Sequence, residues 1–287
     1  MRFARRRTIA PMALPTRSLG DTGVRVSALG LGAVKIGRTE ALKHPGCKTA
    51  LPSDEEVQRL LATARDLGVN LLDTAPAYGV SEARLGALLT GQRDAWVIST
   101  KVGEEFTNGK SRYDFSTMAI RASVELSLRR LRADYVDVLL LHSDGSAEGE
   151  LERDETIDAL RQARDAGYAR LVGASTKTLE GALRCVEALD VVMLTYNERH
   201  TASELAIAQA AKSGVGVLIK KALDSGWIAH DATAQNPSPC GDHGATAAAL
   251  RFAMAPAGVS SVVVGTTSPD HLRQNAQAIT NPGAHAT

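Results

Sequence analysis

The sequence predicts an α/β protein built as a (β/α)8 TIM barrel, and three observations favour this fold. Eight short apolar runs alternate with eight amphipathic segments along the chain. The apolar runs are continuously hydrophobic, which is typical of parallel strands that are covered on both faces. Eight such units in 287 residues suit one barrel. A doubly wound open sheet is the alternative architecture.

The elements follow one another in the order strand, then helix. The strands are expected at 27–32, 69–74, 95–101, 135–142, 169–175, 191–196, 215–221 and 261–266. The helices are expected at 53–68, 81–89, 117–132, 154–167, 178–189, 203–214, 245–256 and 268–279. The first helix has a Ser-Asp cap and early acidic residues and ends at a glycine, and the third ends in a cationic last turn.

One segment, residues 16–30, precedes the first strand and predicts a β-hairpin, because two short β-like runs flank Gly20-Asp21-Thr22-Gly23. A barrel does not require this hairpin, so we expect it to close one end. No stretch resembles a linker between domains. We therefore expect a loose leader over 1–15 and a single barrel domain over 16–287 with a short C-terminal tail.

Charge and composition point to small-molecule partners. The 33 Lys and Arg nearly balance 32 Asp and Glu, so no overall field favours nucleic acid or an anionic membrane. No apolar run approaches membrane-spanning length, and none follows the basic N-terminus. Three widely spaced cysteines form no disulfide framework, which favours a cytoplasmic protein. Cys240 and His243 lack the other two ligands of a structural zinc site, so no metal is expected. The sequence does not indicate the oligomeric state.

Four polar residues stand at or just after the ends of consecutive predicted strands. Asp73 is near the end of the second strand, Tyr78 lies in the loop that follows, Lys101 ends the third strand and His142 ends the fourth. Each residue alone has an ordinary explanation, such as a helix cap, packing or solvation. In a barrel, however, the carboxyl ends of the strands meet on one face, where active sites are built. Together the four predict a proton-transfer site.

The residue types suggest how such a site would work. A phenol has a pKa of about 10, and a nearby ammonium stabilises the phenolate and lowers that pKa. Lys101 can supply the ammonium, and Asp73 would keep it charged. His142 can hydrogen-bond a substrate oxygen or relay a proton. The natural reaction is protonation of a carbonyl oxygen as a hydride reaches its carbon, or the reverse, and it requires a hydride donor.

Several segments together resemble the aldo-keto reductase superfamily. They are GLG at 30–32, DTAPAYGVSEARLG at 73–86, STKVG at 99–103, YVDVLLLH at 135–142 and GAST at 173–176. The resemblance covers nearly the whole chain, from Thr16 to Ile279. It implies a (β/α)8 barrel, NADP(H) bound without a Rossmann domain, and an Asp-Tyr-Lys-His tetrad. That tetrad maps onto the same four residues, with none missing.

The resemblance also implies a cofactor site. It places the backbone near Gly32 beside the nicotinamide and the phosphates at the helix that follows Gly265, although an ordinary Ser-Pro helix cap explains that segment equally well. The implied contacts are Gly32, Ala33, Ser175, Thr176, Met193, Lys220, Lys221, Leu223, Ser225, Gly265, Thr266, Thr267, His271, Gln274 and Asn275. The glycines of GLGAVKIG do not give the dinucleotide fingerprint, and no helix is expected directly after them.

Four of these positions depart from the family pattern. Thr176 replaces an asparagine and Met193 a glutamine, both of which normally hold the carboxamide of nicotinamide. Lys220 replaces the aromatic residue that stacks on the ring, and we hypothesise that its charge favours the reduced cofactor; the alternative is that it turns to a phosphate or to solvent. His271 replaces the arginine for the 2′-phosphate, with Arg273 nearby. NADP(H) is therefore the expected cofactor, and NAD(H) remains an alternative.

The predicted function is NADPH-dependent reduction of an aldehyde or ketone to an alcohol, or the reverse oxidation, with Tyr78 as proton donor. One alternative is a slow-turnover nucleotide-binding redox sensor or partner-binding module that resembles the potassium-channel β-subunits. A barrel lyase or isomerase acting on phosphorylated substrates is a third reading, but it gives the Tyr-Lys-His group no clear task. The chain has only 11 aromatic residues and a short tail, so we expect an open substrate pocket.

Overall fold

The computed structural model describes residues 13–42, 50–145, 151, 153–228 and 243–280. Eight parallel strands close into a barrel in the spatial order β10-β11-β12-β3-β4-β5-β8-β9. The strands are β3 (Leu29–Gly32), β4 (Leu71–Asp73), β5 (Val97–Val102), β8 (Val136–His142), β9 (Ala169–Ser175), β10 (Val191–Thr195), β11 (Gly216–Lys220) and β12 (Val259–Gly265). The predicted barrel is confirmed.

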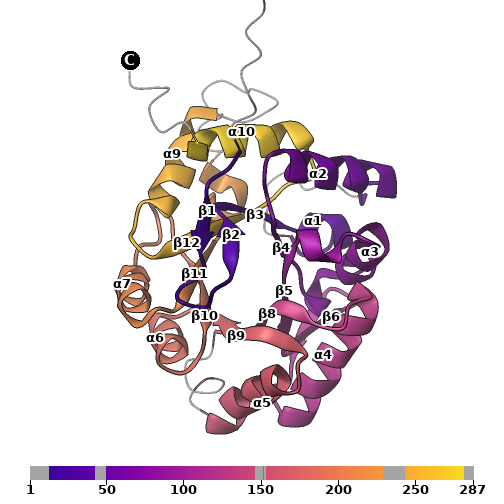
Figure 1. The fold of residues 1–287 in the computed structure, drawn as a ribbon, viewed down its shortest axis with the longest axis vertical. Helices are drawn as coiled ribbons and strands as arrows, with labels where there is room; N and C mark the ends of the chain where they lie inside the picture. The colour runs from indigo at the N-terminus through magenta and orange to yellow at the C-terminus, as the bar shows by residue number, and fades with distance from the viewer. Residues whose placement is uncertain (1–12, 43–49, 146–150, 152, 229–242, 281–287) are drawn as a thin grey trace, which may run out of the picture.

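Eight of the helices in the described part of the chain form a ring outside the strands (Figure 1). They are α2 (Asp54–Asp66), α3 (Ser81–Leu88), α4 (Thr117–Leu131), α5 (Asp154–Asp165), α6 (Leu179–Ala188), α7 (Glu204–Ser213), α9 (His243–Met254) and α10 (Pro269–Thr280). Local chemistry fixes their ends: Ser53 and Glu56 form a reciprocal capping box at the start of α2. Gly214 takes a left-handed conformation (φ 71°) after α7. No described helix has the length and apolar character needed to cross a membrane.

The N-terminal hairpin is also present, formed by the antiparallel strands β1 (Thr16–Ser18) and β2 (Arg25–Ser27). Figure 1 shows it lying across the barrel. Leu19, Val24 and Val26 are buried in one cluster with residues from the barrel interior, such as Leu71 and Val138. The hairpin therefore closes the amino-terminal end of the barrel by the burial of apolar side chains. The division into a 1–15 leader and a 16–287 domain stays a prediction.

The sequence analysis missed two elements near the carboxyl ends of the strands. A one-turn helix, α1 (Val34–Gly37), follows β3 almost directly, so the expectation of no helix there is wrong. One turn is too short to produce a hydrophobic period. A polar hairpin of β6 (Glu104–Thr107) and β7 (Lys110–Tyr113) follows β5. Its largely exposed residues gave no core signal, although Asn108-Gly109 is a hairpin-turn pair.

Candidate active site

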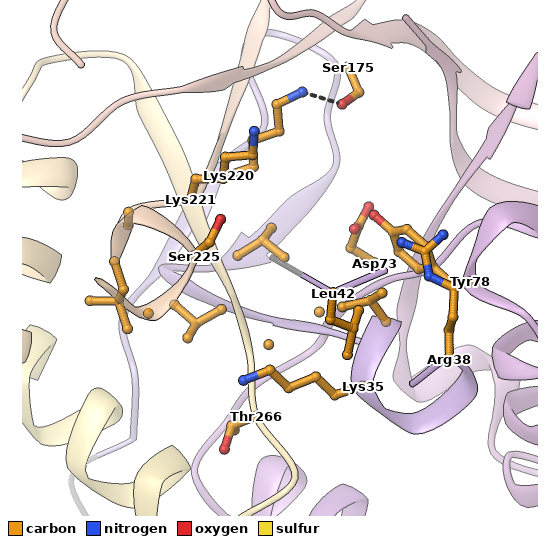
Figure 2. Close-up of a pocket in the computed structure, with 18 of the residues that line it drawn as sticks. Lys35, Arg38, Leu42, Asp73, Tyr78, Ser175, Lys220, Lys221, Ser225 and Thr266 are labelled. Carbon is orange, nitrogen blue, oxygen red and sulfur yellow. Dashed lines mark hydrogen bonds between the residues drawn. The ribbon is translucent and has the colours of Figure 1, made fainter. Parts of the chain in front are cut away.

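A cavity of about 830 Å³ opens at the carboxyl ends of the barrel strands. Asp73, Tyr78 and His142 line it, whereas Lys101 lies buried beneath. Figure 2 shows Asp73 and Tyr78 on one side and Lys220 with Ser175 on another. The residues that the resemblance implies for the cofactor also line the cavity, with the exception of Ala33, Thr176 and Thr267. The barrel thus brings together the polar residues that the sequence analysis selected.

Asp73 and Lys101 form a buried ion pair from the adjacent strands β4 and β5. Lys101 Nζ donates to both carboxylate oxygens of Asp73, at 2.7 and 2.8 Å, and to the carbonyl oxygen of Thr74 at 2.9 Å. Ser99 Oγ donates to the same carboxylate at 3.2 Å. Burial tends to lower the pKa of Lys101, but the attraction of Asp73, with a contribution from Tyr78, outweighs burial and raises that pKa. The lysine is therefore a positive charge at neutral pH.

Tyr78 ends a short 3-10 helix, η1 (Pro76–Tyr78), and its ring centroid lies 4.7 Å from Lys101 Nζ. A Cβ atom on Gly37 would collide with the carbonyl oxygen of Tyr78, so only glycine lets α1 pack this closely. Burial raises the pKa of Tyr78, Lys101 opposes this and Asp73 adds to it. The expected lowering is thus wrong, because Asp73 offsets much of the lysine's charge and desolvation is the larger effect. The phenol carries its proton at neutral pH.

His142 has a partner that the sequence analysis missed. Its Nδ1 lies 2.6 Å from Oε2 of Glu104 in β6, although the carboxylate is out of line with the ring N–H. Ser111 Oγ donates to the other oxygen of Glu104 at 2.5 Å, across the β6–β7 hairpin. The His142 ring meets the Tyr78 ring edge-on, with centroids 6.1 Å apart. The Asn108-Gly109 turn is the signal that could have located this hairpin.

The charges of this pair follow from burial. Burial lowers the pKa of His142 to about 4, with help from the positive charge of Lys101 and against the attraction of Glu104. Burial pushes the pKa of Glu104 up, but His142 and Ser111 outweigh it and bring that pKa to about 2. At neutral pH the imidazole is therefore neutral and the carboxylate is ionised.

The neutral His142 predicts a loss of stability in mild acid. In the unfolded chain its pKa returns to about 6.5, so between pH 6.5 and 4 the unfolded state binds more protons and acid favours unfolding. Between pH 7 and 5 the free energy of unfolding should fall by about 2 kcal/mol more in wild type than in His142→Gln. Urea denaturation at pH 7 and at pH 5 measures this difference. Both pH values lie above the pKa of Glu104 in the folded protein, which is about 2. His200→Gln, at an exposed position, should show the same fall in unfolding free energy between pH 7 and 5 as wild type. An equal fall in wild type, His142→Gln and His200→Gln would contradict a neutral, buried His142.

Lys220, at the end of β11, points into the cavity and donates to Ser175 Oγ at 2.7 Å (Figure 2). Burial and the charges of Lys221, Lys101 and Lys177 lower its pKa well below the ordinary value. The hypothesis that Lys220 repels an oxidised ring assumed a permanent cation, which this environment opposes.

Strands β9 and β10 make a backbone contact beside this lysine. The Thr176 N–H donates to the Met193 carbonyl oxygen at 2.9 Å, and the buried Thr176 Oγ1 has no hydrogen-bond partner among the described residues. Thr176 thus directs its backbone to β10 and not to the cavity, which it does not line.

The start of α10 supplies the last part of the cavity wall. Ser268 N–H donates to Thr266 Oγ1 at 3.1 Å, and His271 N–H donates to Ser268 Oγ at 3.3 Å. His271 lines the cavity, whereas Arg273 pairs with Asp270 at 2.7 Å and reaches Thr63 at 3.4 Å. Arg273 therefore forms its contacts with Asp270 and Thr63 and does not line the cavity.

Neither thiol nor metal chemistry is evident in the described part of the chain. Burial raises the pKa of Cys185 to about 12, which makes that thiol inert. Cys47 and Cys240 lie outside the described residues. Among the described residues no three His, Cys, Asp or Glu side chains gather as metal ligands.

Comparisons with known proteins agree with this geometry. The aldo/keto reductase family model matches residues 28–282. D-threo-aldose 1-dehydrogenase of a Pseudomonas species is 29% identical and covers 89% of this chain and 90% of its own. L-galactose dehydrogenase of Arabidopsis thaliana is 29% identical, over 92% of this chain and 88% of its own.

Two solved structures share the fold. A Pseudomonas aeruginosa protein, classed provisionally as an aldo-keto reductase, is 42% identical with a TM-score of 0.82, over 96% of this chain and 98% of its own. An aldo-keto reductase of Bacillus halodurans in its holo form is 25% identical with a TM-score of 0.76, over 96% and 92%. The chain belongs to the aldo/keto reductase family and is an oxidoreductase.

Proposed function

We propose that this oxidoreductase interconverts a small carbonyl compound and its alcohol with NADP(H), and that Tyr78 carries the proton. The observation that supports this most directly is a protonated phenol whose ring lies 4.7 Å from a buried ammonium, at the wall of a cavity of about 830 Å³. The family membership supports the general reaction class. The roles of individual residues are our proposal.

The lining of the cavity suits a nicotinamide nucleotide. Lys35 extends toward the middle of the cavity (Figure 2), and Lys221 and His271, the latter in the first turn of α10, also line it. Cationic side chains and a helix N-terminus therefore stand where phosphate groups would bind. Gly32 and Gly265 are the last residues of neighbouring strands and leave the backbone there uncovered. A bound nicotinamide would supply or accept the hydride.

The protein's own groups would handle the proton. In the reduction direction Tyr78 donates its hydroxyl proton to the carbonyl oxygen, and Lys101 stabilises the phenolate that remains. Asp73 holds Lys101 in its charged form through two hydrogen bonds. His142, neutral and backed by Glu104, orients the substrate oxygen beside the phenol.

Sugars are the substrate class that we propose first. Relatives named for the oxidation of D-threo-aldoses and of L-galactose each match about nine-tenths of this chain. The cavity wall also carries polar and charged side chains, among them Glu104, Ser111 and Arg38, whose guanidinium stacks on Phe106 at 4.0 Å. These groups can form hydrogen bonds with the hydroxyl groups of a sugar.

A substrate panel tests the proposal. Purified protein would be mixed with NADP⁺ and a set of aldoses, and with NADPH and small aldehydes, while the nicotinamide absorbance is followed. We expect turnover with at least one aldose or aldehyde. Tight NADPH binding, seen by fluorescence, without turnover on any member of the panel would contradict the enzymatic role and favour the redox-sensor alternative.

His271 offers a prediction on cofactor choice. If its ring contacts the 2′-phosphate, His271→Leu should weaken NADPH binding by roughly tenfold, the value of one charge-assisted hydrogen bond, and leave NADH binding unchanged. Arg273→Leu is the matched control, because that guanidinium is paired with Asp270, and it should change neither affinity. Fluorescence titration measures both dissociation constants, and an unaltered NADPH affinity in His271→Leu would rule out the assignment.

A further inference from the structure

Lys220 lies inside the cavity that we propose binds the carbonyl substrate, and the proposed mechanism does not use it. It is the last residue of β11, and its amine lies in the same cavity as Tyr78 and His142. Its hydrogen bond goes to the Ser175 hydroxyl at 2.7 Å. Within the described residues Lys220 forms no ion pair with a carboxylate. An amine has N–H donors whether or not it is protonated, so this contact does not require an ammonium.

The surroundings of Lys220 oppose a positive charge on it. Lys101, Lys177 and Lys221 act on it as like charges, and the carboxylate that acts on it, Asp73, gives both of its oxygens to Lys101. Burial and these neighbouring cations lower the pKa of Lys220 well below its ordinary value. Desolvation and adjacent cations are the two features that activate lysine nucleophiles in enzymes.

The backbone holds Lys220 in this direction. The residue that follows it, Lys221, takes a left-handed conformation with φ 56°, which turns the chain sharply at the end of the strand. Asn197 Nδ2 donates to the Lys221 carbonyl oxygen at 2.8 Å and so fixes this turn. Strand pairing with β10 sets Lys220 opposite Thr195. The amine is thus presented to the cavity from a rigid strand end.

We propose that Lys220 is an amine nucleophile that captures small aldehydes in this cavity as a reversible imine. The nitrogen lone pair attacks the carbonyl carbon and forms a carbinolamine. The carbonyl oxygen then leaves as water, both of whose hydrogens come from the neutral –NH2 group of Lys220, and a C=N bond remains. No oxidant or reductant takes part, and the step needs no nucleotide.

Reductive trapping tests the proposal on the full-length protein without nucleotide. The protein would be incubated at pH 7 with glycolaldehyde and sodium cyanoborohydride, which reduces an imine to a stable secondary amine. Peptide mass spectrometry would follow the adduct on each lysine with time. An ordinary lysine with a pKa of about 10.4 is unprotonated in only about one molecule in 2,500 at pH 7. We expect Lys220 to be labelled at least tenfold faster than the exposed Lys110 and Lys212.

Two variants make the assignment specific. Lys220→Arg should lose the fast adduct and keep the slow ones, whereas Lys177→Arg should keep the fast adduct. Labelling of Lys220 no faster than that of Lys110 or Lys212, or a fast adduct that persists in Lys220→Arg, would overturn the proposal. Turnover with nucleotide is measured separately, so fast labelling without turnover refutes the proposed redox function alone, and turnover without fast labelling refutes the imine alone.

Discussion

Tyr78→Phe should lower kcat by a factor of about 10² to 10⁴, which is the usual contribution of a positioned general acid or base. The change removes one oxygen atom and leaves the ring that packs at 4.7 Å from Lys101 Nζ and edge-on to His142. The cavity keeps its shape, so the dissociation constant of NADPH should change by no more than about twofold, because only the proton transfer is lost. Steady-state kinetics on a substrate from the panel and fluorescence titration with NADPH measure the two quantities.

Tyr113→Phe is the matched control for this experiment. Tyr113 also lines the cavity, but it stands on the β6–β7 hairpin, where it interacts with Glu104. Its variant should keep most of the wild-type kcat. A positioned proton donor is expected to contribute at least about a hundredfold to kcat. If Tyr78→Phe retained more than about a tenth of the wild-type kcat, Tyr78 would not be that donor.

Asp73→Asn should cost about 3 to 5 kcal/mol of unfolding free energy, because removing one partner of a buried ion pair leaves the other charge without compensation. Lys101 is 1% exposed and depends on both oxygens of Asp73. The asparagine keeps the size of the side chain but offers one acceptor and no charge. Burial would then lower the pKa of Lys101, and the stabilisation of the phenolate would be lost with it. Urea denaturation at pH 7 measures the stability.

The control for this variant is an exposed pair. Arg121 and Glu125 lie one turn apart on α4 with their side chains 72% and 35% exposed, and Glu125→Gln should have little effect on stability. The double variant Asp73→Asn with Lys101→Met should recover part of the lost stability and none of the activity. A loss below about 1 kcal/mol in Asp73→Asn would mean that the pair is not the buried, mutually dependent unit described here.

The barrel was predictable because its signals are local and repeated. Each of the eight strands is a short apolar run such as β8, and each is followed by a helical segment. The helices α2, α4 and α6 begin at a capping Ser or Thr. The proximity of Asp73, Tyr78, Lys101 and His142 followed from topology alone, since all four stand at or near neighbouring strand ends. Their functional roles remain proposals.

Other features of the site depend on distances that a sequence does not contain. Glu104 reaches His142 through a polar hairpin with no hydrophobic pattern. The pKa of Tyr78 depends on how desolvation compares with the opposing charges of Lys101 and Asp73, and simple proximity to a cation suggested the wrong sign. The chain turns directly after Lys220 because Lys221 takes a left-handed conformation, and no glycine or asparagine in the sequence indicates a turn at that position.

The β1–β2 hairpin has a consequence for the order in which ligands bind. Leu19, Val24 and Val26 pack with the side chains that fill the barrel interior, so ligands reach the cavity from the carboxyl ends of the strands. Whichever ligand occupies the deepest position must arrive before the other and depart after it. Steady-state kinetics should therefore show a compulsory sequence of addition, with the outer product released first.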